Sequence, residues 1–157
     1  MAYDELLVEI SEKWVGTITL NRPDQLNTFN SVMAASLYKA LMDLDNDPKV
    51  RVLVIKGAGK AFCAGIDVHE LEGQTTLSYR EWIERMERPL VAIAKLRKPV
   101  IAQVHGVAAA NGMGLVAAAD LAIAAANARM GLTAINVGLN CVGPVIPVSK
   151  SVGRKKA

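Results

Sequence analysis

Two glycine-containing segments, each following an apolar run, offer more exposed backbone than side chain. The first is KAFCAGIDVHE (60–70), and the second is HGVAAANGMG (105–114). Small side chains let a substrate carbonyl approach the backbone N–H groups of such bends. Two N–H groups aimed at one point form an oxyanion hole, which stabilises negative charge developing on an oxygen atom. We therefore predict that the two bends act together through main-chain donors, although a plain turn at Gly65 would also explain the first bend taken alone.

Phosphate-binding and dinucleotide-binding loops fit these segments poorly. GAGK (57–60) matches the end of a phosphate-binding loop, but that motif needs Gly at position 54 and Ser or Thr at position 61. The chain has Val54 and Ala61 there. The glycines of the second bend do not have the GxGxxG spacing of a dinucleotide site. Neither kind of site is predicted.

The bends require a scaffold, and the surrounding pattern predicts alternating strands and helices. The predicted strands are 8–10, 15–20, 50–55, a run starting at Pro99, and LAIAAA (121–126). The last three are almost entirely apolar, which is typical of strands buried on both faces. The predicted helices are one capped by Ser31 and stopped by Asp47–Pro48, one over 78–97 bent or broken at Pro89, and one following the second bend. This alternation favours an α/β fold with a mostly parallel sheet.

Composition limits the class of protein. The 157 residues are 52% hydrophobic, with a formal net charge of +3, which is too small to indicate nucleic-acid binding. The basic tail SVGRKKA (151–157) is a solvated end or a contact for an anionic ligand. Cys63 and Cys141 form neither a disulfide framework nor a metal-binding spacing. The N-terminus lacks signal-peptide features and no uninterrupted apolar run reaches 18 residues, so we expect a cytoplasmic protein without membrane contact.

The ordered set of motifs carries a resemblance to a known family. LNRPDQLNTFN, KAFCAGIDV, KPVIAQVHG, AADLAIA and the C-terminal GLNCVGPVIPVSKSVGRKKA together resemble the crotonase (enoyl-CoA hydratase/isomerase) superfamily over almost the whole chain. The resemblance implies a crotonase-like superhelix of stacked ββα units. Residues 1–157 would then be its N-terminal core domain, with the C-terminal helical part missing. It also implies an acyl-CoA thioester substrate, a homotrimer or hexamer, and no metal or separate cofactor, because coenzyme A enters as part of the substrate.

Particular residues follow from the resemblance by position. The oxyanion donors would be the backbone N–H groups of Ile66 and Asn111, which would hold an enolate formed on the thioester oxygen. The adenine of coenzyme A would lie near Ala64, Asp67 and Val68.

The two glutamates that hydratases of this family use have no counterpart here. By position they would be Gly114 and Ala134, and neither side chain can transfer a proton. Ordinary hydratase activity is therefore in doubt. Asn140 and Cys141 are substitute candidates: Asn140 to position a water, Cys141 as a nucleophile. Asn140 could equally be a turn residue, and Cys141 inert packing.

The remaining candidates have a structural and a functional interpretation. His69 is a base or a solvated residue, and His105 is a catalytic or a hydrogen-bonded structural histidine. Asp120 is expected to anchor a loop or a strand start. The stripe of Trp82, Met86 and Leu90 is expected to face the core, and it could also border an acyl pocket.

The expected function is that of an enoyl-CoA hydratase/isomerase-like enzyme, a lyase or isomerase of fatty acid metabolism that stabilises an enolate. Two alternatives stay open. One is a catalytically silent or diverged acyl-CoA-binding protein, and the other is a structural subunit of a mixed oligomer.

Overall fold

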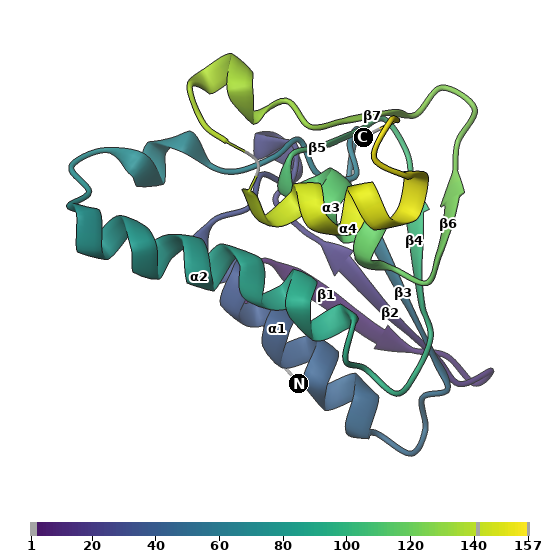
Figure 1. Cartoon of the computed structure of the whole chain (residues 1–157). Helices are drawn as coiled ribbons and strands as arrows, with labels where there is room; N and C mark the ends of the chain where they lie inside the picture. The colour runs from purple at the N-terminus through teal and green to yellow at the C-terminus, as the bar shows by residue number, and fades with distance from the viewer. Residues whose placement is uncertain (1–2, 141, 157) are drawn as a thin grey trace.

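The computed structural model describes residues 3–140 and 142–156 (Figure 1). The strands are β1 (Leu6–Ile10), β2 (Val15–Leu20), β3 (Val52–Gly57), β4 (Val100–Val104), β5 (Val107–Ala109), β6 (Leu121–Ala124) and β7 (Arg129–Gly131). The helices are α1 (Ser31–Asn46), α2 (Thr76–Ile93), α3 (Asn111–Ala118) and α4 (Val142–Val152), with short 3-10 turns η1 (Pro23–Gln25), η2 (Val68–Leu71) and η3 (Ala134–Val137).

Five strands form the main sheet, in the order β1-β2-β3-β4-β6. Only β1 and β2 pair antiparallel, as a hairpin, and every other pair in this sheet is parallel. The predicted mostly parallel sheet is therefore confirmed. Strands β5 and β7 pair parallel in a second, two-stranded sheet. In the chain, β5 begins shortly after the end of β4.

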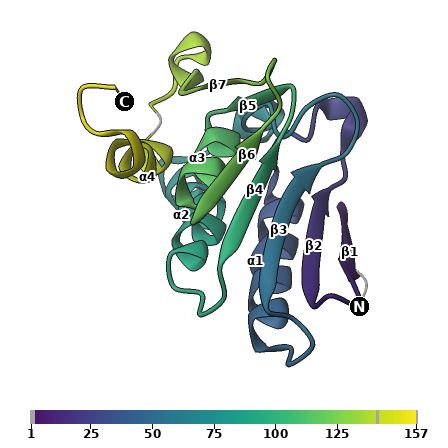
Figure 2. The same ribbon diagram turned by 90° about the vertical axis from the view of Figure 1, so that its right-hand side faces the viewer.

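The helices gather on one face of the main sheet, as Figure 2 shows. Leu53 and Ile55 of β3 are fully buried, as are Met33, Leu37 and Leu41 of α1, and all five belong to one hydrophobic core. The i, i+4 spacing of these α1 side chains places them on one helix face. Each fully buried side chain of this size contributes about 1.5–3 kcal/mol relative to an exposed one, so this core fixes α1 against the sheet.

Three helix boundaries differ from the predictions. The N-cap of α1 is Asn30, whose side chain accepts a hydrogen bond from the backbone N–H of Met33 at 2.8 Å, so the prediction of Ser31 as the cap was wrong. Helix α2 starts at Thr76 rather than at residue 78, because Thr75 and Ser78 form a capping box there. It ends at Ile93, before the predicted residue 97.

Pro89 lies inside α2 without ending it, so of the two predicted effects, a bend or a break, the break does not occur. Trp82 and Met86 on one side of the proline, and Leu90 on the other, are all buried. Proline has no backbone N–H, so the helix lacks one hydrogen bond at Pro89. Burial of the continuous apolar stripe stabilises the helix despite this loss.

Strand β6 was predicted to be buried, and this was wrong. All four of its residues are exposed, with Leu121 at 61% and Ile123 at 64% relative exposure. It is the last strand of the main sheet among the described residues, so it has a neighbour on one side only. Within the described residues, no helix combines the length and the hydropathy needed to span a membrane.

Candidate active site

The two bends are joined directly by backbone hydrogen bonds. Phe62 N–H donates to His105 O at 2.9 Å and Cys63 N–H donates to Val107 O at 3.0 Å. In return, Ala109 N–H donates to Cys63 O at 2.9 Å. The first bend thus runs parallel to β5, and the predicted meeting of the two segments is present.

This close approach requires glycine in the second bend. A Cβ atom at Gly112 would lie 2.2 Å from Cys63 O, which is far inside any allowed contact. In the first bend, Gly65 has a φ of +120°, which a residue with a side chain rarely adopts. A Cβ atom there would lie 3.5 Å from the Ala110 Cβ, so the residues that precede Ile66 and Asn111 are neighbours in space.

The backbone before Asn111 is held in an unusual conformation. Ala110 has a φ of +46° and a ψ of −115°, although it is not glycine. Such a conformation costs on the order of 1–3 kcal/mol and persists only where the surroundings enforce it. Here Ala110 N–H donates to Gly131 O at 3.0 Å and Ala110 O accepts from Gly114 N–H at 2.9 Å. Unusual backbone of this kind concentrates at functional sites.

The backbone N–H groups of Ile66 and Asn111 accordingly remain available. Among the described residues, neither group donates a hydrogen bond to a protein acceptor. Asn111 is buried, and its side-chain amide donates to Met86 O at 3.3 Å, which ties the second bend to α2. Backbone donors of buried residues are nearly always paired, so the free N–H of buried Asn111 is unusual, and that of partly buried Ile66 is also open to an external acceptor.

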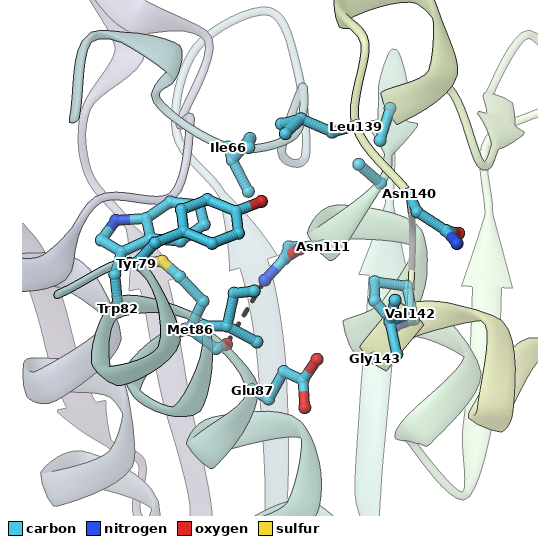
Figure 3. Close-up of a pocket in the computed structure, with 14 residues that line it drawn as sticks. Ile66, Tyr79, Trp82, Met86, Glu87, Asn111, Leu139, Asn140, Val142 and Gly143 are labelled. Carbon is cyan, nitrogen blue, oxygen red and sulfur yellow. Dashed lines mark hydrogen bonds between the residues drawn. The ribbon is translucent and has the colours of Figure 1, made fainter. Parts of the chain in front are cut away.

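Both residues line one cavity, which lies between the bends, α2 and the start of α4 (Figure 3). The residues around it are Ile66, Tyr79, Trp82, Ile83, Met86, Glu87, Ala110, Asn111, Ala134, Leu139, Asn140, Val142, Gly143 and Pro144. Most are apolar, and the rings of Tyr79 and Trp82 stack with centroids 5.8 Å apart. An apolar cavity with a few polar groups is the usual form of a small-molecule site.

Glu87 is the one carboxylic acid among the described residues that line this cavity, and sequence reasoning missed it. Burial raises the pKa of the Glu87 carboxyl above its ordinary value. A signal was present, because Glu87 follows Ile83 by four residues and precedes Leu90 by three. A charged residue between apolar residues at helical spacing marks a carboxyl directed toward the interior.

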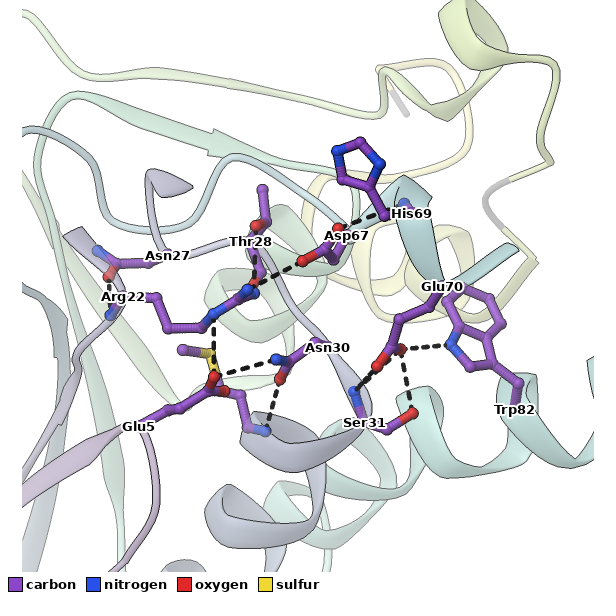
Figure 4. A network of polar contacts seen from close by, with 11 residues as sticks. Glu5, Arg22, Asn27, Thr28, Asn30, Ser31, Asp67, His69, Glu70 and Trp82 are labelled. Carbon is purple, nitrogen blue, oxygen red and sulfur yellow. Dashed lines mark hydrogen bonds and ion pairs between the residues drawn. The ribbon is translucent and has the colours of Figure 1, made fainter. Parts of the chain in front are cut away.

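A polar network anchors the segment that follows Ile66 (Figure 4). Arg22 pairs with Asp67 at 2.9 Å and with Glu5 at 3.1 Å, and its guanidinium also donates to Thr28 O at 2.7 Å. Bonds of this charge-assisted type are the stronger class of hydrogen bond. They fix the backbone immediately after Ile66.

Glu70 provides a second anchor for the same segment. Its carboxylate accepts from Ser31 N–H at 2.9 Å and from Trp82 Nε1–H at 2.7 Å. The negative charge thus lies at the N-terminus of α1, where the helix dipole favours it. Glu70 links the first bend to both α1 and α2.

The residues expected to contact coenzyme A lie on both sides of Ile66 in the first bend. Ala64 is half-buried, and its N–H donates to Leu26 O at 3.0 Å. The Asp67 carboxylate is engaged by Arg22 and by the backbone N–H of His69 at 3.3 Å. Val68 is exposed.

The two positions without glutamate have different surroundings. Ala134 is buried and lines the cavity. Gly114 does not line it, because a Cβ atom there would meet Leu90 Cδ2 at 2.6 Å and Pro144 Cβ at 3.1 Å.

Of the two substitute candidates, the structure describes Asn140 alone. Asn140 is exposed at the cavity rim, and its side chain points away from Asn111 (Figure 3). Cys141 lies outside the described residues. Within the described residues, no group of three or more His, Cys, Asp and Glu side chains is placed to hold a metal ion.

The structure gives hydrogen-bonding roles to two of the remaining candidates. His105 forms a hydrogen bond between Nε2 and Gly59 O at 3.0 Å, and Asp120 accepts from Val100 N–H at 2.8 Å at the start of β4, so both structural interpretations are confirmed. His69 is exposed. The side chains of the α2 stripe are buried in the core, as expected. Two of them, Trp82 and Met86, also line the cavity.

Comparison with known proteins agrees with this geometry. Residues 11–157 match the family model described as enoyl-CoA hydratase/isomerase. The chain is 38% identical over 159 residues to the 1,2-epoxyphenylacetyl-CoA isomerase of Escherichia coli (strain K12), covering 98% of this chain and 60% of that protein. It is 30% identical over 147 residues to the peroxisomal Delta(3,5)-Delta(2,4)-dienoyl-CoA isomerase of Arabidopsis thaliana, covering 86% of this chain and 53% of that protein.

Solved structures lead to the same fold. A crystal structure of an enoyl-CoA hydratase from Mycobacterium smegmatis superposes with a TM-score of 0.92 and 42% identity, covering 97% of this chain and 60% of that one. The chain thus spans about 60% of the length of such relatives. The predicted crotonase fold is confirmed, and the chain belongs to the enoyl-CoA hydratase/isomerase family.

Proposed function

We propose that this chain binds an acyl-CoA thioester and holds the enolate oxygen formed on it between the backbone N–H groups of Ile66 and Asn111. The observation that carries the proposal is the pair of unpaired N–H groups on two hydrogen-bonded bends beside one apolar cavity. Each such donor lowers the barrier by about 2.7–4 kcal/mol in enzymes where it has been removed by mutation. Membership of the family supports the substrate class.

The first bend is also the proposed contact for coenzyme A, through Ala64, Asp67 and Val68. The Asp67 carboxylate already pairs with Arg22. We therefore assign the recognition of adenine at Asp67 to backbone atoms rather than to the carboxylate.

Binding of a short acyl thioester tests the proposal. The cavity has a volume of about 60 Å³. This is roughly twice the volume that one water molecule occupies in liquid water, so a short acyl group is the suitable probe. Crotonyl-CoA at about 100 times its dissociation constant should stabilise the fold by about 2.7 kcal/mol, which for a chain of this size raises the melting temperature by roughly 5–10 °C. An unchanged melting temperature in millimolar crotonyl-CoA would contradict the proposal that the substrate is an acyl-CoA thioester.

Hydration of crotonyl-CoA should nevertheless be slow. Gly114 and Ala134 supply no carboxyl group to hold and activate water. A hydration rate typical of enzymes, on the order of 10 per second, would contradict this reasoning. Loss of the absorbance of the conjugated thioester measures it directly.

We also propose that the chain assembles as a homotrimer or hexamer, as its resemblance to the family implies. The exposed apolar strand β6, with Leu121 and Ile123, supports burial against another chain. Light scattering during size-exclusion chromatography gives the assembly mass, and a monomer at working concentration would contradict the proposal.

A further inference from the structure

The cavity contains one carboxyl group that the family positions do not explain. Glu87 lies on α2 directly after Met86, whose carbonyl accepts the hydrogen bond from the Asn111 side chain. The carboxyl therefore lies on the helix segment that is tied to a proposed oxyanion donor. Figure 3 shows it between α2 and the start of α4, at the cavity that Asn111 and Ile66 also line.

The structure leaves room for this carboxyl and leaves it unpaired. A Cβ atom at Gly143 would lie 2.4 Å from Glu87 Oε1, so only glycine at this position admits the side chain in its observed place. Within the described part of the chain, Glu87 forms no ion pair and accepts no hydrogen bond from a side chain or a backbone N–H. A partly buried carboxyl that lines a cavity and has a raised pKa is a candidate for acid–base chemistry.

We infer that Glu87 is the acid–base residue of this cavity and that it moves a proton between carbon atoms of a bound acyl thioester. The inference rests on the proposed function, because the charge left on the thioester must be held by Ile66 and Asn111. The reaction inferred for Glu87 is the isomerisation of an unsaturated acyl chain.

The proton balance explains why one carboxyl suffices. The Glu87 carboxylate takes a proton from an acidic carbon of the acyl chain, the C–H electron pair moves into the conjugated enolate, and the negative charge rests on the thioester oxygen. The same carboxyl then returns the proton to a different carbon of the enolate, and the double bond shifts. No water, oxidant or reductant is consumed. Hydration would require further groups to hold and activate water.

Exchange of the α-protons of butyryl-CoA in D₂O tests the inference, because it isolates the first proton transfer. Proton NMR should show exchange with the wild-type chain. Glu87→Gln should lower that rate by about 10²–10⁴-fold, the usual contribution of a general base. Affinity for butyryl-CoA, measured by calorimetry, should change little, since the amide has the same shape. Glu84→Gln is the matched control, because Glu84 is an exposed residue of the same helix that pairs only with Arg80.

The pH profile gives a readout that a purely structural role would not produce. Exchange should rise with pH as Glu87 loses its proton, over a range above that of an exposed glutamate because burial raises its pKa. Among the described residues, the other titratable groups that line the two adjoining cavities are Tyr79 of α2, Lys95 just after the end of α2, and Lys150 of α4. Helix α3 and residues 133–140 contribute no charged side chain. Glu87→Asp should retain part of the exchange and a rising limb, and Glu87→Gln should lose that limb.

The outcomes separate this inference from the proposed function. Binding of butyryl-CoA with equal exchange in the wild type and Glu87→Gln overturns the role of Glu87 and leaves the oxyanion hole standing. Binding without any exchange in the wild type also overturns it. Failure of the wild-type chain to bind the thioester overturns the proposed function, and the role of Glu87 fails with it.

Discussion

Adding one methyl group at Gly112 should separate the two bends. In Gly112→Ala the new Cβ would stand 2.2 Å from Cys63 O and 2.8 Å from Cys63 Cβ. Carbon and carbonyl oxygen atoms normally stay at least roughly 3.3 Å apart, so the bends must move by about 1 Å. The atom that must yield is a backbone carbonyl already bonded to Ala109 N–H, so a side-chain rotation cannot relieve the clash.

The expected effects follow from the size of that movement. Overpacking a tight core costs about 1–3 kcal/mol, and each kcal/mol lowers the melting temperature of a chain of this size by about 2–4 °C. A shift of 1 Å also removes one donor from a hydrogen bond of normal length, which should lower catalytic turnover by about 10²–10³-fold.

Calorimetry and α-proton exchange measure the two effects in the same preparations. Gly131→Ala is the matched control, because it adds the same methyl group where the nearest atom, Thr133 Cγ2, is 3.9 Å away. Equal melting temperatures and equal exchange rates for Gly112→Ala and Gly131→Ala would refute the claim that the close approach at Cys63 builds the site.

Other parts of the structure lead to further predictions. Arg22→Met leaves the carboxylates of Asp67 and Glu5 without their guanidinium, and because both are largely buried the free energy of unfolding should fall by about 2–3 kcal/mol in urea titrations. Lys39→Met, which breaks the exposed pair with Asp43, should cost at most about 1 kcal/mol, and equal losses would contradict the anchoring role of Arg22. Burial raises the pKa of the Cys63 thiol from 9.0 to about 12, so in the folded state it keeps its proton at pH values where the unfolded chain loses it. The difference in free energy of unfolding between wild type and Cys63→Ala should therefore be constant below pH 9 and shrink by up to about 1.4 kcal/mol per pH unit above it, and a constant difference up to pH 11 would show that the thiol is accessible.

The sequence predicts the parallel sheet and the meeting of the two bends, because both depend on local signals. Apolar runs such as 50–55 mark the strands, and small residues mark the bends that follow them. The exposure of β6 could not be predicted in this way, since apolar composition does not show whether a strand has a neighbour on both sides. The cap of α1 also depended on geometry, because Asn30 and Ser31 are both good capping residues and only the turn decides between them.

The sequence suggested the backbone donors of the candidate site, and it did not suggest Glu87. Ile66 and Asn111 were proposed by position, and the structure places both beside one cavity. The positive φ of Ala110 has no sequence signal, because tertiary hydrogen bonds enforce it. Glu87 was missed because the search followed the family's glutamate positions, Gly114 and Ala134. A carboxyl can reach the same cavity from α2, and the helical spacing of Glu87 from Ile83 and Leu90 was the signal for it.

The most direct test of the central claim is a crystal structure of the chain with an acyl-CoA thioester bound. We expect the thioester oxygen to lie about 2.7–3.1 Å from both backbone nitrogens, those of Ile66 and Asn111. A thioester oxygen bound elsewhere in the cavity, or in contact with only one of the two nitrogens, would contradict it.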